Sequence, residues 1–206
     1  ALEHGVDGLI CVNERAGGHA GSRSAELLLE ELGDLGVPLV CAGGIGAPGD
    51  FQAALEQGYA ACQLGTRFIA TQECRAHDDY KQAIVRAQPH DIVLTDKISG
   101  VPVAVIETPY VKKVGTKAGF IARRMLRHPK LKHYARMYYS LKSIWQLKRA
   151  SLKGATYRDY WQAGKSVGGV SEVLPAGEVV ARFAAAIEAA AVEAGAGDPE
   201  DSSGAS

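Results

Sequence analysis

Short apolar runs alternate with amphipathic segments through the first third of the chain. Apolar runs that end at glycines predict β-strands at residues 6–12, 37–45 and 59–68. Between them, residues 24–36 and 48–58 carry apolar positions at helical spacing, and both segments end at a glycine. Strand and helix therefore alternate with short links. This order predicts parallel strands with right-handed crossovers, either in an open sheet or in a (β/α)₈ barrel.

The pattern changes after residue 76. Residues 77–88 predict a helix, and residues 91–111 predict extended structure because they are rich in β-branched residues and turn signals. Residues 117–154 predict two amphipathic, aromatic-rich helices that break near Pro129. We therefore divide the chain into four parts: βα units at 1–110, a basic aromatic helical segment at 111–160, a loop and final helix at 161–194, and a disordered tail at 195–206.

Charge is distributed unevenly along a chain whose net charge is zero. Between Thr108 and Tyr157 there are thirteen Lys or Arg residues and no Asp or Glu. This segment predicts a basic surface for an anionic partner such as a phosphate-bearing ligand. The alternative is a solvated helix pair neutralised by an acidic neighbour on the same molecule. The neutral overall charge argues against a nucleic-acid partner.

Apolar runs and cysteines bear on the cellular compartment. No run is long enough to span a membrane and no signal peptide is visible, so we expect a cytoplasmic protein. The four cysteines lie far apart without a C-x-x-C pair, and we expect reduced thiols rather than a metal site. Cys74 and His77 could suggest a metal pair, but we expect Cys74 to pack at the start of a helix and His77 to cap that helix.

Glycines follow the second and third predicted strands, at the strand ends where parallel α/β folds place their sites. Gly43 and Gly44 end the second strand, and Gly65 with Thr66 lies at the end of the third. Without Cβ atoms, the backbone N–H groups there can approach an anion, and the threonine hydroxyl adds a donor. The glycines could instead only make tight turns. Two adjacent loops with this pattern favour a phosphate ligand.

The loop after the first predicted strand, "NERAGGHAG" at residues 13–21, carries a histidine among glycines. Gly17, Gly18 and Gly21 predict a backbone with positive φ, or one against which a flat group lies. His19 titrates in a range suited to proton transfer near neutral pH. A histidine in such a loop could equally be a turn or surface residue. Because this loop would share a rim with the phosphate loops, we interpret His19 as a candidate catalytic residue.

Four segments carry a family resemblance: "AGGHAG" at 16–21, "AGGI" at 42–45, "QLGTRF" at 63–68 and "ATQECRAH" at 70–77. They resemble the nitronate monooxygenases, formerly called 2-nitropropane dioxygenases, and the related flavin-dependent type II enoyl-acyl-carrier-protein reductases. The resemblance covers residues 1–90 and returns at 161–180. A glycine-rich phosphate segment alone would also fit inosine monophosphate dehydrogenases. The histidine loop, together with "GTRF" and "EC..H", separates this family from them.

The resemblance implies a (β/α)₈ barrel that binds FMN non-covalently, with His19 as the base that takes a proton from the substrate. The implied FMN-binding residues are Gly17, Gly18, Gly43, Gly44, Gln63, Leu64, Gly65 and Thr66. The implied reaction is oxidation of a nitronate or nitroalkane with O₂. One alternative is a reductase or dehydrogenase of an acyl-CoA or acyl-carrier-protein thioester, with NAD(P)H as a further reductant. The other is a non-catalytic phosphate-binding subunit.

The chain departs from the family in two respects. Family members are longer, and their extra residues precede the start of this chain. We therefore expect an α/β fold that is the C-terminal portion of a (β/α)₈ TIM barrel with an added, mostly helical basic segment. The N-terminal barrel half would come from the same protein or another chain. Assembly into a homo-oligomer is a further alternative. The second departure is the basic stretch at 112–153, which suits the phosphates of an acyl thioester through Arg123, Arg124, Arg127 and Lys130.

Overall fold

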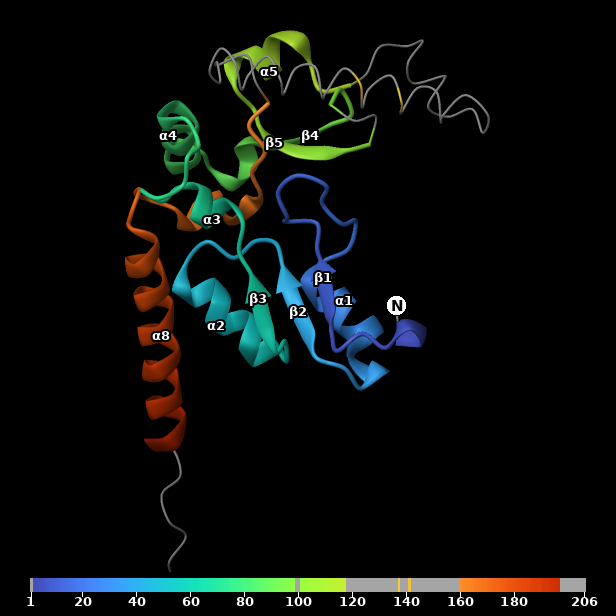
Figure 1. Ribbon diagram of the computed structural model, residues 1–206, viewed down its shortest axis with the longest axis vertical. Coiled ribbons are helices and arrows are strands. Elements are labelled where there is room, and N and C mark those ends of the chain that lie inside the picture. Colours follow the sequence, from blue (N-terminus) through green and yellow to red (C-terminus); the bar gives the residue numbers. More distant parts are fainter. Residues whose placement is uncertain (1, 99–100, 118–136, 138–140, 142–159, 197–206) are drawn as a thin grey trace, which may run out of the picture.

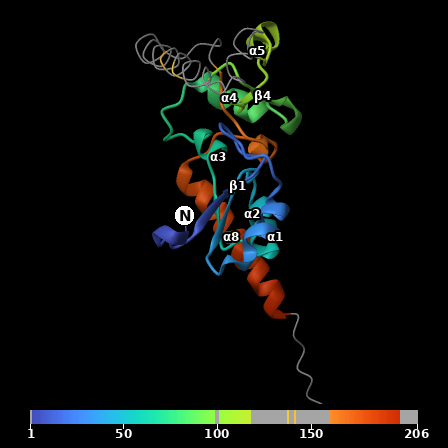
Figure 2. The ribbon, with the colours of Figure 1, turned by 90° about the vertical axis from the view of Figure 1, so that its right-hand side faces the viewer.

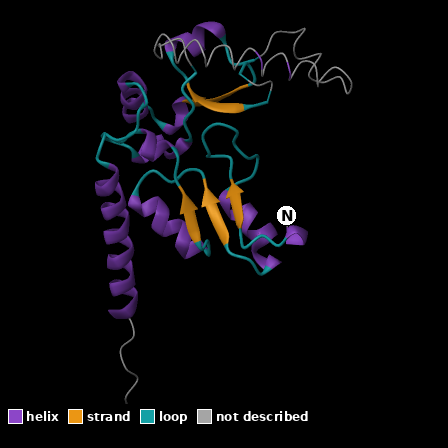
Figure 3. Cartoon of the chain, in the orientation of Figure 1, coloured by secondary structure: helices purple, strands orange, loops and turns teal. Residues whose placement is uncertain are grey.

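A three-stranded parallel sheet forms the centre of the N-terminal region. The computed structural model describes residues 2–98, 101–117, 137, 141 and 160–196. The sheet has the order β1-β2-β3, with β1 at Leu9–Val12, β2 at Leu39–Ala42 and β3 at Ala61–Gln63. All three strands point the same way (Figure 3). The predicted βα alternation and the α/β class are confirmed.

Two helices connect these strands in the segments that the sequence predicts, but the first α-helix ends earlier than predicted, because residues 33–35 form a 3₁₀ turn. α1 runs from Ala25 to Leu32, and the Ser24 side chain caps it by accepting a hydrogen bond from the amide of Leu27 at 3.2 Å. α2 spans Pro48–Gln57, and at its start Asp50 Oδ2 accepts bonds from the amides of Gly46 and Ala47, both at 2.9 Å. It ends at Gly58, whose φ of 114° few other residues adopt.

The two helices cover only one face of the sheet. Leu9, Leu39 and Cys41 pack against α1 and α2 in a cluster that also contains Tyr59. Residues of the opposite parity point to the other face, where the side chains of Ile10 and Val12 are 59% and 42% exposed. Figure 2 shows both helices on the same side of the strands. The sheet therefore has one buried and one open face.

A second group of elements lies beyond the carboxyl ends of the strands (Figure 1). It contains an antiparallel hairpin of β4 and β5, whose register pairs Ile92 with Ile106. The bounds of the group are α3 Thr66–Ile69, α4 Asp78–Arg86, β4 Ile92–Thr95, β5 Val103–Ile106 and α5 Pro109–Val114. The prediction of one strand over 59–68 was therefore too long, because the "GTRF" segment begins α3. The prediction of extended structure at 91–111 is confirmed for β4 and β5 but is wrong at its end, because residues 109–111 form the first turn of α5, where Pro109 is tolerated.

The C-terminal part returns to the sheet. A 3₁₀ turn at Lys165–Gly169 is followed by α8 at Ala176–Ala196, which packs along α2. The rings of Phe51 on α2 and Phe183 on α8 meet edge-on with centroids 5.8 Å apart. The predicted final helix is confirmed and extends into the predicted tail.

Several predictions fall on residues that the structure does not describe. The two predicted basic helices lie almost wholly outside the described residues. So do the four proposed thioester-binding residues, Arg123, Arg124, Arg127 and Lys130, and most of the predicted tail. Among the residues that are described, no helix combines the length and apolar character needed to cross a membrane.

Candidate functional site

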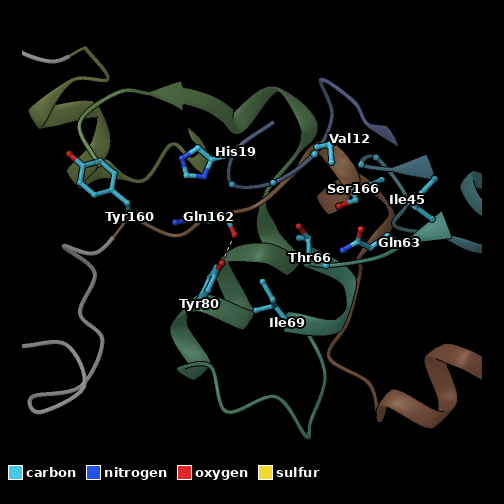
Figure 4. Close-up of a pocket in the computed structure, with 17 residues that line it drawn as sticks. Val12, His19, Ile45, Gln63, Thr66, Ile69, Tyr80, Tyr160, Gln162 and Ser166 are labelled. Atoms are coloured by element: carbon cyan, nitrogen blue, oxygen red, sulfur yellow. Dashed lines mark hydrogen bonds between the residues drawn. The ribbon is translucent and has the colours of Figure 1, made fainter. Parts of the chain in front are cut away.

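A cavity of about 550 Å³ lies at the carboxyl ends of the parallel strands. Its volume is within the range of small-molecule and cofactor sites. It is lined by eight residues that the sequence singled out: Gly17, Gly18, His19, Gly43, Gly44, Gln63, Gly65 and Thr66. In Figure 4, His19 and Tyr160 lie toward one end of the cavity, and Gln63, Thr66 and Ser166 lie toward the other. The loops after β1, β2 and β3 therefore meet in one cavity.

Asn13 and Gly18 hold the histidine loop in place. Asn13, only 1% exposed, accepts a bond from the amide of Arg15 at 2.8 Å and donates one to the carbonyl of Gly43 at 2.9 Å. Further along, Gly18 exchanges two backbone bonds with Ala104 on β5, at 3.3 and 2.6 Å. His19 directly follows this anchor, and its side chain is exposed. The loop thus presents an accessible imidazole from a fixed backbone.

Gly43 and Gly44 form one half of a backbone cradle. Their φ values are 120° and 85°, which residues with a Cβ rarely adopt. A Cβ on Gly43 would lie 2.4 Å from Asn13 Oδ1, and one on Gly44 would lie 2.8 Å from Arg15 Nε. Glycine is therefore required here to let the loop after β2 pass beneath the loop after β1.

Gly65 and Thr66 form the other half of the cradle. A Cβ on Gly65 would meet no atom within 4 Å, so the protein itself does not require glycine there. Within the described residues, the amides of Gly44, Gly65 and Thr66 donate no hydrogen bond. Thr66 Oγ1 accepts a bond from the amide of Gly164 at 3.0 Å, which leaves the hydroxyl proton available to a ligand. These donors and this space fit the phosphate of a cofactor such as FMN.

Two tyrosines, Tyr80 and Tyr160, form the wall of the cavity away from the glycine cradle. The Tyr80 hydroxyl donates a hydrogen bond to the carbonyl of Gln162, and its ring stacks on Trp161 with centroids 5.7 Å apart. The ring of Tyr160 meets Tyr110 edge-on at 6.0 Å. Burial raises the pKa of both Tyr80 and Tyr160, so both hydroxyls stay protonated at neutral pH. The wall is thus uncharged and aromatic.

The structure adds residues that the sequence predictions missed. Tyr80, Tyr160, Gln162 and Ser166 also line the cavity. The last two belong to a glycine-rich segment that the sequence did single out. This segment reaches the site because Gly17 and Gly164 let two segments of the chain cross closely: a Cβ on Gly17 would lie 2.7 Å from the amide nitrogen of Gly164.

Leu64 differs from the other predicted FMN-binding residues. Its side chain packs against the hydrophobic cluster between the sheet and the helices and is not part of the cavity lining. Gln63, the last residue of β3, lines the cavity, whereas Leu64 directly after the strand packs with Cys62 on the helix-covered side. Leu64 could contribute only its main chain to a cofactor.

Comparison with known proteins gives a family match over nearly the whole chain. A family model described as nitronate monooxygenase matches residues 1–196. A Mycobacterium tuberculosis protein named (3aS,4S,5R,7aS)-5-hydroxy-7a-methyl-1-oxo-octahydro-1H-indene-4-carboxyl-CoA dehydrogenase is 34% identical over 125 residues, which are 57% of this chain and 35% of that protein. A probable nitronate monooxygenase from Staphylococcus saprophyticus is 32% identical over 122 residues, 53% of this chain and 34% of that protein.

Among solved structures, that of FabK from Thermotoga maritima superposes with a TM-score of 0.72 at 26% sequence identity. The match covers 94% of this chain and 58% of that one. The chain thus spans about a third of the length of these curated relatives and somewhat more than half of this structural neighbour.

Proposed function

Because the chain belongs to the nitronate monooxygenase family, we propose that it forms part of an FMN-dependent oxidoreductase that oxidises a nitronate or nitroalkane with O₂. One observation carries the proposal. A single cavity brings together an accessible histidine and two glycine loops whose amides are free to bind a phosphate. Each feature alone has a structural explanation. Their convergence at the carboxyl ends of three parallel strands is typical of a cofactor site.

In this proposal the cradle holds the cofactor. The amides of Gly44, Gly65 and Thr66 bind the phosphate, and Gly17 and Gly18 lie along the flavin ring. FMN, when bound, would supply the electron acceptor for the oxidation. The protein then has to position the substrate carbon and to manage its proton.

His19 is the proposed base. Its imidazole would remove the proton from the carbon beside the nitro group and hold that proton while the substrate is oxidised. The stacked rings of Tyr80 and Trp161 would exclude water from this end of the cavity. Because the Tyr80 and Tyr160 hydroxyls stay protonated, the wall adds no negative charge that would repel an anionic nitronate.

A second candidate function is reduction or dehydrogenation of an acyl thioester. The observation in its favour is the 34% identical M. tuberculosis relative, which is named a carboxyl-CoA dehydrogenase. Such a substrate carries phosphates, for which the basic residues at 112–153 remain the predicted partners. NAD(P)H would serve as a reductant if the reaction runs as a reduction.

We also propose that the parallel sheet is part of a (β/α)₈ barrel. The face of the sheet away from α1 and α2 is open, with Ile10 59% exposed. In a barrel, helices cover the outside and this face points inward. The remaining strands would come from a region homologous to the part of the relatives that the chain does not match, in the same protein or another chain.

A turnover assay of the FMN-loaded chain separates these functions. O₂ consumption with neutral 2-nitropropane, which still carries the proton on the carbon beside the nitro group, supports the first candidate, and NADH oxidation with an enoyl-CoA supports the second. His19→Ala should keep FMN bound and reduce turnover by about 10²-fold or more, because a positioned base contributes on that order.

His90→Ala is the matched control, because the His90 side chain is 81% exposed and lies outside the cavity lining. It should leave turnover unchanged. Equal turnover in the His19 variant and the wild type would remove His19 from the role of base. Stable FMN binding without turnover of either substrate would favour a non-catalytic phosphate-binding subunit.

A further inference from the structure

Three cysteines form a row across the parallel sheet. The strand register places Cys11 beside Cys41 and Cys41 beside Cys62. Neighbouring strands lie about 4.8 Å apart, which is within the Cα separation that a disulfide requires. All three side chains belong to the cluster on the helix-covered side of the sheet, and all three are reduced. The proposed reaction at His19 uses none of them.

One of these cysteines borders a second cavity. A space of about 300 Å³ lies between the N-terminal end of α1 and the side of α2, and Cys41 is the one cysteine among its lining residues. Arg15, Glu26 and Asp50 also line it. The residue is only 2% exposed, so only a molecule close to the size of water could reach it from the cavity. Residues 43–45 line both this cavity and the proposed FMN site.

The surroundings of the sulfurs make Cys41 the nucleophile of the row. Hydrogen bonding from the Cys62 thiol, helped by the Asn13 amide 3.6 Å from the sulfur, lowers the pKa of Cys41. The same bond raises the pKa of Cys62, which keeps its proton. Burial, followed by the nearby Cys41, raises the pKa of Cys11. The thiolate, which is the reactive form, therefore belongs to Cys41.

We propose that Cys41 and Cys62 are a peroxide-sensitive dithiol that closes to a disulfide between β2 and β3, with the second cavity as the entry for the oxidant. The Cys41 thiolate attacks hydrogen peroxide, so that an S–O bond forms, the O–O bond breaks and hydroxide leaves. The Cys62 thiol then attacks the Cys41 sulfur, the S–S bond forms and water leaves. The hydroxide takes up the proton that the Cys41 thiol released on ionising, so two thiols lose two electrons and one peroxide becomes two waters.

Peptide mapping of the full 206-residue chain tests this proposal. The reduced chain is treated with a few equivalents of hydrogen peroxide and then unfolded in denaturant that contains iodoacetamide, which alkylates the remaining free thiols. A glutamate-specific protease then cuts the chain and separates Cys41 from Cys62 at Glu56. We expect the alkylated Cys41 and Cys62 peptides to be replaced by one disulfide-linked pair, whose mass is two hydrogen atoms below the sum of the two unalkylated peptides. Cys74, which is outside the row, should remain alkylated.

Two variants complete the test. Cys62→Ser removes the resolving thiol and should leave a sulfenic acid on Cys41, which dimedone traps when the oxidised chain is unfolded in its presence. Cys74→Ser is the matched control and should form the same disulfide as the wild type. Oxidation of Cys74 while Cys41 and Cys62 stay alkylated would overturn the proposal, and a Cys11–Cys41 pair would overturn the pairing. Because the main result comes from the wild-type chain, a variant that fails to fold does not decide it.

Discussion

Gly43, Gly44 and Gly65 line the same cavity but are glycines for different physical reasons. The first two have positive φ, and a Cβ on either would collide with Asn13 or Arg15. Gly65 has a φ of −114° and open space where a Cβ would be. Substitution at the first two positions damages the fold and the site together. Gly65 can test the site alone.

Gly65→Val should therefore weaken FMN binding and leave the fold intact. The added side chain would occupy space that the proposal gives to the phosphate, and we expect at least about a tenfold rise in Kd, or 1.4 kcal/mol. The free energy of unfolding without FMN should change by no more than about 0.5 kcal/mol. Calorimetric FMN titration and urea unfolding measure the two quantities.

Gly49→Ala, on α2, is the matched control, because its Cβ would also meet no atom within 4 Å and it is not among the residues that line the cavity. It should bind FMN as the wild type does. If Gly65→Val also retains full affinity, the phosphate does not lie where we place it.

Tyr59 tests the packing of the covered face of the sheet. It is 3% exposed, and its hydroxyl donates a 2.7 Å bond to the carbonyl of Ala25. Tyr59→Phe should cost about 1 kcal/mol at neutral pH. Burial, the largest cause, raises the pKa of Tyr59. The stabilisation by the neutral phenol is therefore complete below the unfolded pKa of about 10 and declines as the pH rises above it.

Urea unfolding at neutral pH and at about pH 11 checks this sign. The wild type should lose more stability than Tyr59→Phe between the two conditions, because only the wild type has the buried Tyr59 phenol to ionise, while the other buried tyrosines are the same in both. Tyr110→Phe, at a partly exposed tyrosine at the start of α5, removes the same atom as a control. Equal losses in the wild type and in Tyr59→Phe would show that burial of this phenol does not govern alkaline stability.

At the scale of elements, the buried side-chain amide of Asn13 joins the ends of β1 and β2. Asn13 bonds the amide of Arg15 and the carbonyl of Gly43, and so ties the histidine loop to the phosphate cradle. Asn13→Ala leaves these two partly buried groups without their partner, which costs about 1–3 kcal/mol for each. We expect a loss of about 2–4 kcal/mol of stability together with weaker FMN binding.

The exposed amide of Gln52, which bonds Glu56 on α2, provides the comparison. Gln52→Ala should stay within about 0.5 kcal/mol of the wild type in urea unfolding, as surface changes usually do. If Asn13→Ala is as stable as Gln52→Ala, the two loops do not depend on this amide.

Local patterns predicted the elements well and their ends less well. Apolar runs and the Ser24 cap gave β1, β2, α1 and α2, because the signals for these elements lie within a few residues of each other. The apolar pattern predicts that the strand continues through the "GTRF" segment. It forms α3 because the apolar run alone does not show where the strand ends.

Contacts between distant segments could not be predicted from the sequence. The close crossing of Gly17 and Gly164 joins positions far apart in the chain, and no local pattern encodes it. Tyr80 reaches the cavity from a helix whose amphipathic pattern does not distinguish it. The glycine loops and His19 were predictable because parallel strands bring their carboxyl ends to one edge.

At the scale of the whole molecule, the cavity borders the open face of the sheet. Val12 belongs to both, since it lines the cavity and is 42% exposed. Covering this face with the proposed barrel strands would enclose the cavity and exclude water from it. The chain alone should therefore bind FMN more weakly than a complete barrel would. The preference for a phosphate, in contrast, depends on the cradle and should already be present.

The most direct test is a titration of the 206-residue chain with FMN and with riboflavin, which has the same ring but no phosphate. Hydrogen bonds to a charged group contribute about 1.5–3 kcal/mol each, so the cradle predicts that FMN binds at least about tenfold more tightly than riboflavin. This ratio does not depend on how far the open face weakens both ligands. Equal affinities, or no saturable binding of FMN, would contradict a flavin phosphate site at these loops.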